Sequence, residues 1–249
     1  MKAARRILAV AAGAAITLGA AGAAYADSPA ATPTASAGTS ATGKAGSGAA
    51  ARLKVEQALA NARVQGRIST LHALSLAAQN SKYLTSDERG ALDKQITSDL
   101  GGLTSLATQM GDATTVSAVR TDESAMVDDY RVYMLMAPQT RLVDALAAET
   151  DAATTLQKAE SALQQLLVKQ PGGGSTQQKS ELADLQSQIS QAQTAIGSDV
   201  ATVLAIQPGP DASSIESALA PVRSSVKSAR KDLVQARQDA KELRDSLKS

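Results

Sequence analysis

The chain of 249 residues contains no cysteine, phenylalanine or tryptophan, and its only histidine is His72. Without cysteine the protein cannot rely on disulfides, even where the compartment would permit them. Zinc and copper sites draw mainly on nitrogen and sulfur ligands, so a single imidazole argues against a metal centre. A catalytic triad would have to rest on His72 alone. We therefore expect His72 on a helix surface, no metal or other cofactor, and no enzymatic activity.

Aromatic residues are also scarce, at 2% of the chain. No wide core of large rings can form, and a thin core of Ala, Leu, Val and Ile suits pairs or triples of packed helices. Glycine and proline are confined to a few places instead of recurring every ten residues, which argues against an all-β chain. Strong helix formers dominate elsewhere. The predicted class is all-α: an elongated antiparallel helical bundle with long coiled-coil helices.

Residues 1–26 have the pattern of a secretory signal peptide. A basic start precedes an Ala-rich apolar stretch, and Ala24-Tyr25-Ala26 forms an A-x-A cleavage site. Cleavage there would leave Asp27 as the first residue; an uncleaved membrane anchor is the alternative. No cysteine follows to carry a lipid, and no second segment is long and apolar enough to span a bilayer. The pattern predicts a secreted or extracytoplasmic protein of the cell envelope.

Residues 27–50 form a linker rich in Ala, Thr, Ser and Pro, without Leu, Ile, Val or any aromatic residue. Such a segment cannot bury enough surface to offset the entropy lost on ordering, so its composition predicts disorder. Its serine and threonine content also resembles that of stalks that carry O-linked sugar.

Residues 51–137 show helical periodicity and predict a three-helix region. The first helix should end near Ser81. Thr85 and Glu88 have the spacing of a capping box, in which each side chain accepts from the other residue's backbone amide, and they should open the second helix. Gly111-Asp112 should end it.

A third helix should run from about Thr115 to Ala137. Pro138 lacks an amide hydrogen and disfavours helical geometry at the preceding residue, so we expect it to end or kink this helix. The last turns read DDYRVYMLMAP and contain two of the four tyrosines. We expect the best-filled part of the core here, with Arg131 paired to Asp128. The side chains on its inward face would be Met126, Tyr130, Tyr133 and Met134.

Residues 138–249 predict three long helices packed as an antiparallel coiled coil. The PGGGS sequence at 171–175 is a turn, and Pro208-Gly209-Pro210 should end the second of these helices. The last helix has apolar residues spaced alternately four and three apart, which is a heptad seam. Pro221 lies inside the pattern, where it either kinks the helix or starts it in register. The seam comprises Ile215, Leu219, Val222, Val226, Ala229, Leu233, Ala236, Ala240, Leu243 and Leu247.

Charged residues recur on both sides of this seam. Three interpretations stay open: a solvated flank beside an intramolecular seam, a parallel homodimer in which position g of one chain meets e of the other, and arginine binding to an anionic surface. The arginines, at heptad position e, are Arg223, Arg230, Arg237 and Arg244, and the aspartates, at position g, are Asp232 and Asp239.

The middle of the chain carries a resemblance. The run KYLTSDERGALDKQITSDLGGLTSL, followed by DDYRVYMLMAP, resembles secreted helical proteins of actinobacteria that often contain coiled-coil segments and have no known activity. The similarity covers residues 62–168. It implies an exported helical protein of a high-GC Gram-positive bacterium, and it brings no catalytic residue with it.

These patterns predict a non-enzymatic, exported structural or interaction protein of the cell envelope, with a protein or envelope component as its partner. The alternative is a binder that docks its Arg-bearing C-terminal helix on anionic lipid or wall polymer. Nucleic acid is not an expected partner, because the basic charge is sparse and stacking aromatics are nearly absent.

Overall fold

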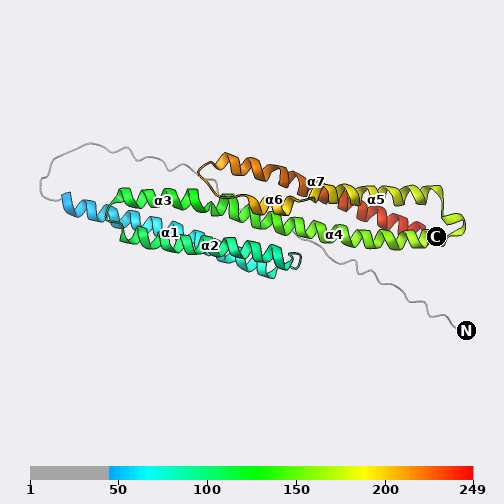
Figure 1. Ribbon diagram of the computed structural model, residues 1–249, viewed down its shortest axis with the longest axis horizontal. Coiled ribbons are helices and arrows are strands. Elements are labelled where there is room, and N and C mark those ends of the chain that lie inside the picture. Colours follow the sequence, from blue (N-terminus) through cyan, green and yellow to red (C-terminus); the bar gives the residue numbers. More distant parts are fainter. Residues whose placement is uncertain (1–44, 249) are drawn as a thin grey trace, which may run out of the picture. The chain divides into compact units, whose positions relative to one another are not determined.

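A computed structural model describes residues 45–248, with side chains from Gly48 onward (Figure 1). These residues form helices joined by turns, and they contain no strand. The predicted all-α helical bundle is thereby confirmed. The predicted signal peptide at 1–26 and most of the predicted linker, 27–44, lie outside the described residues.

The first three helices are α1 (Ala45–Asn80), α2 (Ser86–Asp112) and α3 (Val116–Tyr130). The capping box is confirmed: the Glu88 amide donates to the Thr85 hydroxyl over 3.2 Å, and the Thr85 amide donates to the Glu88 carboxylate over 2.8 Å. One boundary differs, because α1 already includes residues 45–50 of the expected linker. Adding Ala-rich turns to an existing helix avoids the cost of nucleation, so composition alone placed this boundary too late.

The sequence predicted a break at Pro138, but the break after α3 lies at Arg131. Arg131 has left-handed backbone angles (φ 38°, ψ 40°). A π-helical turn (Val132–Met136) follows and leads directly into α4 (Ala137–Val168). Ala137 has ordinary helical angles, and Pro138 stands in the first turn of α4, where its missing N–H costs little. The end expected for the third helix at Ala137 is therefore wrong, since α3 ends at Tyr130.

This break also changes which side chains of DDYRVYMLMAP face inward. Met126 is buried and Tyr130 half-buried, but Tyr133 and Met134 are 55% and 39% exposed. The expected inward face assumed one uninterrupted helix, and the left-handed residue with its π-helical turn rotates everything that follows. The expectation that Tyr133 fills the core is therefore wrong. The buried side chains of the turn are Val132, Leu135 and Met136.

Replacing Tyr133 by alanine should consequently lower the melting temperature by only a few degrees. The ring lies 5.2 Å from the Arg67 guanidinium, a cation–π contact worth about 0.5–1 kcal/mol at an exposed site. Thermal melting followed by circular dichroism measures the loss, with Tyr130→Ala as the variant expected to lose more. A Tyr133→Ala protein that melted as early as Tyr130→Ala would contradict this placement.

Three further helices complete the bundle: α5 (Thr176–Ile196), α6 (Asp199–Ala205) and α7 (Ala212–Ser246). The predicted PGGGS turn is confirmed, with Gly172, Gly173 and Gly174 all at positive φ. The helix that follows this turn was expected to end at Pro208, and that expectation is wrong. Gly197 (φ 41°, ψ −125°) ends α5, and the short α6 follows.

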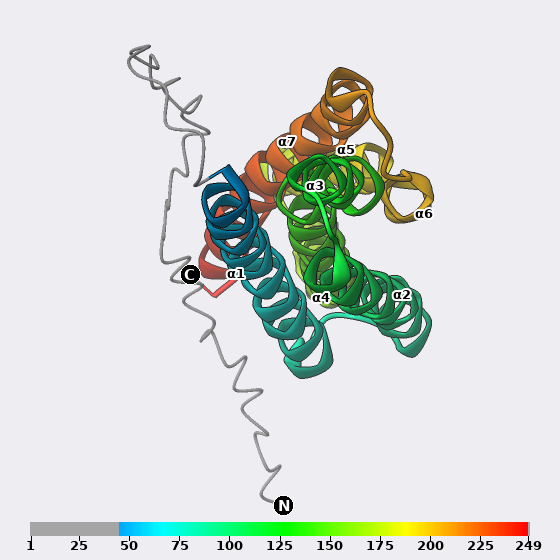
Figure 2. The ribbon, with the colours of Figure 1, turned by 90° about the vertical axis from the view of Figure 1, so that its left-hand side faces the viewer.

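Helices α3 and α4 run end to end through the middle of the bundle (Figure 1). The α1–α2 hairpin lies on one side of them and α5–α7 on the other, as the end-on view also shows (Figure 2). Helix α7 is antiparallel to α5 and runs in the same direction as α4 (Figure 1).

The apolar seam of α7 is filled within the chain, by α4 and α5 over most of its length and by Leu135 of the π-helical turn at Ile215 and Leu219. The helix is unbroken at Pro221, and the seam keeps its phase there, since Leu219 and Val222 are both buried. Of the ten seam residues, only Ala240 and Leu247 are partly exposed. The prediction of an intramolecular seam is confirmed. The seam is therefore not exposed, and a parallel homodimer would have no apolar surface to bury there.

Candidate functional site

The four arginines beside the α7 seam have different surroundings. Arg230 donates from Nε to Glu149 of α4 over 2.7 Å, and Glu149 is only 7% exposed. Arg244 pairs with its neighbour Asp245. Arg223 and Arg237 are exposed, and within residues 48–248 neither has an ion-pair partner. The regular spacing therefore does not produce one uniform basic surface.

The two aspartates turn toward α5. Asp239 accepts from Gln188 of α5 over 2.7 Å and from Gln235 over 2.8 Å. Asp232 lies in the groove between α5 and α7. Because Arg230 reaches α4 and Asp239 reaches α5, the two predicted flanks face different helices. The structure thus separates the predicted set of six instead of bringing it together.

Arg230→Gln should cost about 1–3 kcal/mol of folding free energy, since it leaves the Glu149 carboxylate buried without its cation. The same change at Arg223 or Arg237 should stay within about 0.5 kcal/mol. Urea unfolding of the three variants at pH 7 measures the difference. A double-mutant cycle with Glu149→Gln isolates the energy of the Arg230–Glu149 pair. Equal losses of stability for all three arginine variants would contradict the prediction.

A concave surface of about 910 Å³ lies between α5 and α7. It is an open polar groove, and a smaller hollow of about 430 Å³ continues it toward Thr194 and Ser228. The side chains lining it come from these two helices only. They are Glu181, Asp184, Ser187, Gln188 and Gln191 of α5, and Lys227, Arg230, Lys231, Asp232, Val234, Gln235, Asp239 and Glu242 of α7.

A second polar cluster fixes the segment after α5. Arg131 donates to the carbonyl oxygens of Gly209 (2.9 Å) and Pro210 (2.6 Å), and also to the Asp128 carboxylate (2.9 Å), which confirms the predicted Arg131–Asp128 pair. Gln95 and the buried Gln139 donate to the carbonyls of Leu204 and Val203 at the end of α6. Local sequence carried a signal for the Asp128 pair alone, because the other partners are far away in the chain.

A third feature is a notch in α2. Tyr130 lies over Gly102, where a methyl group would come within 2.6 Å of ring atom Cζ. Burial raises the pKa of Asp99, three residues earlier on α2, to about 6. Burial together with the charges of Asp129 and Asp99 raises the pKa of Tyr130. The notch places an acid that resists ionisation beside the tyrosine.

Asp99→Asn should remove part of the pH dependence of stability. The pKa is about 6 in the folded chain against 3.8 for the free side chain. The folded state therefore holds the proton more tightly, and stability is lost as the pH rises from about 4 to 6. Because Asp99 stays partly in water, we expect roughly 1 kcal/mol. Urea unfolding at pH 4.5 and 7.5 should show a clearly larger gain for Asp99→Asn at pH 7.5; equal gains at both pH values would contradict this prediction.

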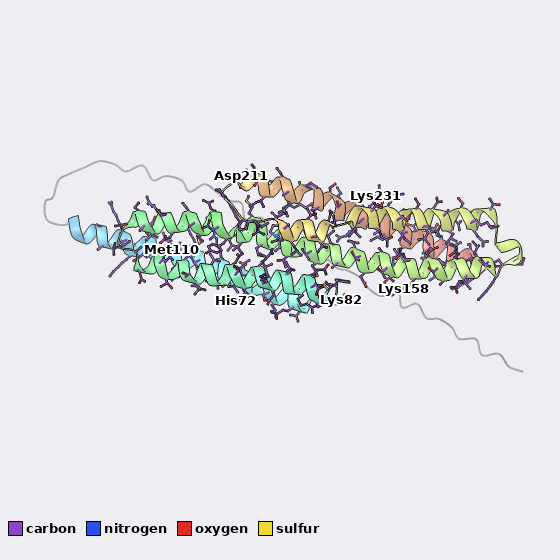
Figure 3. The ribbon with its side chains drawn as sticks, viewed as in Figure 1. His72, Lys82, Met110, Lys158, Asp211 and Lys231 are labelled. Carbon is purple, nitrogen blue, oxygen red and sulfur yellow. The ribbon has the colours of Figure 1, made fainter. Side chains whose placement is uncertain are left out.

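His72 is exposed on α1, as expected (Figure 3). The described residues contain no group of three or more His, Cys, Asp or Glu side chains placed to hold a metal ion. Within the same residues, no helix combines the length and apolar character required to cross a membrane.

Comparison with known proteins identifies no relative: no protein-family model matches the chain, and no curated protein or solved structure is significantly similar to it.

Proposed function

We propose that this protein is an exported, non-enzymatic interaction protein of the cell envelope, and that the groove between α5 and α7 is its contact surface. The observation that carries this proposal is the groove itself, which is open and lined almost entirely by charged and amide side chains. Small-molecule sites are typically enclosed and mostly apolar. A long polar groove between two helices resembles the polar, solvent-accessible rim of a protein contact more closely.

The secretory pattern of residues 1–26 and the linker that follows support the cellular part of the proposal. Export would place the groove outside the cytoplasm, facing envelope components. The resemblance to secreted helical proteins of actinobacteria points in the same direction.

A pull-down from envelope extracts with the tagged full chain tests the proposal. Lys227→Glu/Lys231→Glu should release envelope components that the natural protein retains. The control is Arg141→Glu/Lys158→Glu, which makes the same charge change at exposed residues of α4. In Figure 3, Lys158 and Lys231 lie at opposite edges of the bundle. Equal retention by all three proteins, or by none, would argue against the groove.

Docking on anionic lipid or wall polymer remains the alternative, and the exposed Arg223 and Arg237 favour it. Such docking would depend on charge alone, because the apolar stripe of α7 that an amphipathic helix would insert into a membrane is buried against α4 and α5. Cosedimentation with phosphatidylglycerol vesicles should then fall steeply with salt and disappear in Arg223→Gln/Arg237→Gln. Unchanged binding by that variant would exclude this mode.

A further inference from the structure

The charges of the α5–α7 groove are separated along its length. Gln188 of α5 donates to Asp239 of α7, and Gln178 donates to Ser246, which fixes the antiparallel register of the two helices. Residues 181–184 of α5 therefore lie beside residues 239–246 of α7. One half of the groove holds only acids among its charged residues: Glu181, Asp184, Asp239 and Glu242.

The other half is basic. It contains Lys227, Arg230 and Lys231, with Asp232 as its single acid. Arg230 is already engaged by Glu149, but neither lysine has an ion-pair partner within residues 48–248. Two lysines are thus available at one end of the groove, and four carboxylates lie at the other.

Val234 marks the midpoint between these halves. Lys227 precedes it by seven residues and Glu242 follows it by eight. Its side chain is 64% exposed, and it is the one apolar side chain that lines the groove in the described part of the chain. Its position is what a two-fold axis requires: reversing the groove end for end about Val234 places each charged half over its opposite.

We propose that a second copy of this chain docks antiparallel on the α5–α7 groove, about a two-fold axis near Val234. Such an interface is isologous, since the same surface serves both partners. Lys227 of one chain would face Glu242 of the other, and Lys231 would face Asp239. This surface is distinct from the heptad seam, which is filled within each chain. The inference rests on the proposed use of the groove and adds the identity of its partner.

The magnitudes predict a weak, salt-dependent dimer. The stretch from 227 to 242 is about 24 Å long at about 1.5 Å per residue, so the contact lies at the small end of specific interfaces. Charges at such a rim mainly set orientation and association rate. We therefore expect dimerisation at low ionic strength and its loss at high salt.

A single engineered cysteine tests the axis directly, because the natural chain contains none. Val234→Cys should form a disulfide-linked dimer under mild oxidation, since the two thiols would meet near the axis. The control is Leu76→Cys, equally exposed at 60% but on α1. Non-reducing gels should show at least tenfold faster cross-linking at 234. Equal rates at both positions would overturn the proposal.

Charge exchange tests the orientation. Lys227→Glu/Lys231→Glu leaves Arg230, already paired with Glu149, as the one base of the groove, and Asp184→Lys/Glu242→Lys brings the acidic half to no net charge. Each variant alone should dimerise at least tenfold more weakly by sedimentation equilibrium, and an equimolar mixture should form heterodimers. Arg141→Glu/Lys158→Glu should dimerise like the natural chain.

A mixture that stayed monomeric would overturn self-docking, as would a natural chain monomeric at low salt. Groove-dependent recovery of a different envelope protein would keep the proposed function and reject only the second copy.

Discussion

Replacing Gly102 by alanine should lower the free energy of unfolding by about 1–2 kcal/mol, whereas the same change at Gly101 should raise it by about 0.5–1 kcal/mol. Both glycines lie inside α2, where alanine is the better helix former. At Gly101 nothing lies within 4 Å of an added methyl group, so only the propensity gain acts. At Gly102 the methyl group would occupy the space of the Tyr130 ring.

The Gly102 effect exceeds the propensity gain because the Tyr130 ring is rigid and must leave its notch as a whole. Tyr130 is half-buried against the core of α1, α2 and α3, and moving it exposes apolar surface. Urea unfolding of the two single variants measures the opposite signs. A Tyr130→Ala background supplies the control, because there Gly102→Ala should become stabilising. If both alanines stabilised the natural chain equally, the notch would not be a tight contact.

Arg131→Ala should cost about 3 kcal/mol and loosen the segment from α6 to α7. Alanine keeps the strain of a left-handed residue, which is about 1–2 kcal/mol, and loses the guanidinium that binds two carbonyls and Asp128. Arg131→Gly loses the same hydrogen bonds but adopts this backbone without strain, so it should recover about 1 kcal/mol of the loss. Arg131→Lys should fall between, since an ammonium cannot span the same partners.

Hydrogen exchange provides a local measurement for these variants. Amides around 203–211 should exchange faster in Arg131→Ala and Arg131→Gly, while those of the α1–α2 hairpin should keep their rates. Uniformly faster exchange throughout the chain would indicate general destabilisation and contradict a local clamp. Equal stability of the alanine and glycine variants would show that the left-handed backbone at 131 carries no strain.

Local chemistry in the sequence was sufficient for much of the helix layout. The Thr85–Glu88 capping box, the Gly111-Asp112 end of α2 and the PGGGS turn all depend on residues within a few positions of one another. The α7 seam is likewise readable, because a 4–3 spacing places side chains on one face whatever they pack against. A second capping box, Ser175 with Gln178, has the same readable spacing and was missed.

The sequence could not indicate where long-range contacts override local preference. Arginine rarely adopts left-handed angles, and the break at Arg131 is held by carbonyls at Gly209 and Pro210, 78 and 79 residues away. Gly197 was an available signal for the end of α5, but a helical glycine such as Gly102 looks the same in sequence. The structure distinguishes them: Gly102 lies inside α2 under the ring of Tyr130, whereas Gly197 has φ 41° and ends α5.

For the candidate surface too, some features follow from the sequence and others only from the tertiary structure. By itself the sequence determined that α7 has one apolar stripe with arginine and aspartate beside it, because side-chain direction on a helix follows from spacing alone. Only the tertiary structure decided that Arg230 is used by a buried Glu149, and that Lys227 and Lys231 share a groove with acids of α5. The charge on one helix is local information. The opposing charge across a groove depends on the register in which two helices pack, and that register is set by their common core.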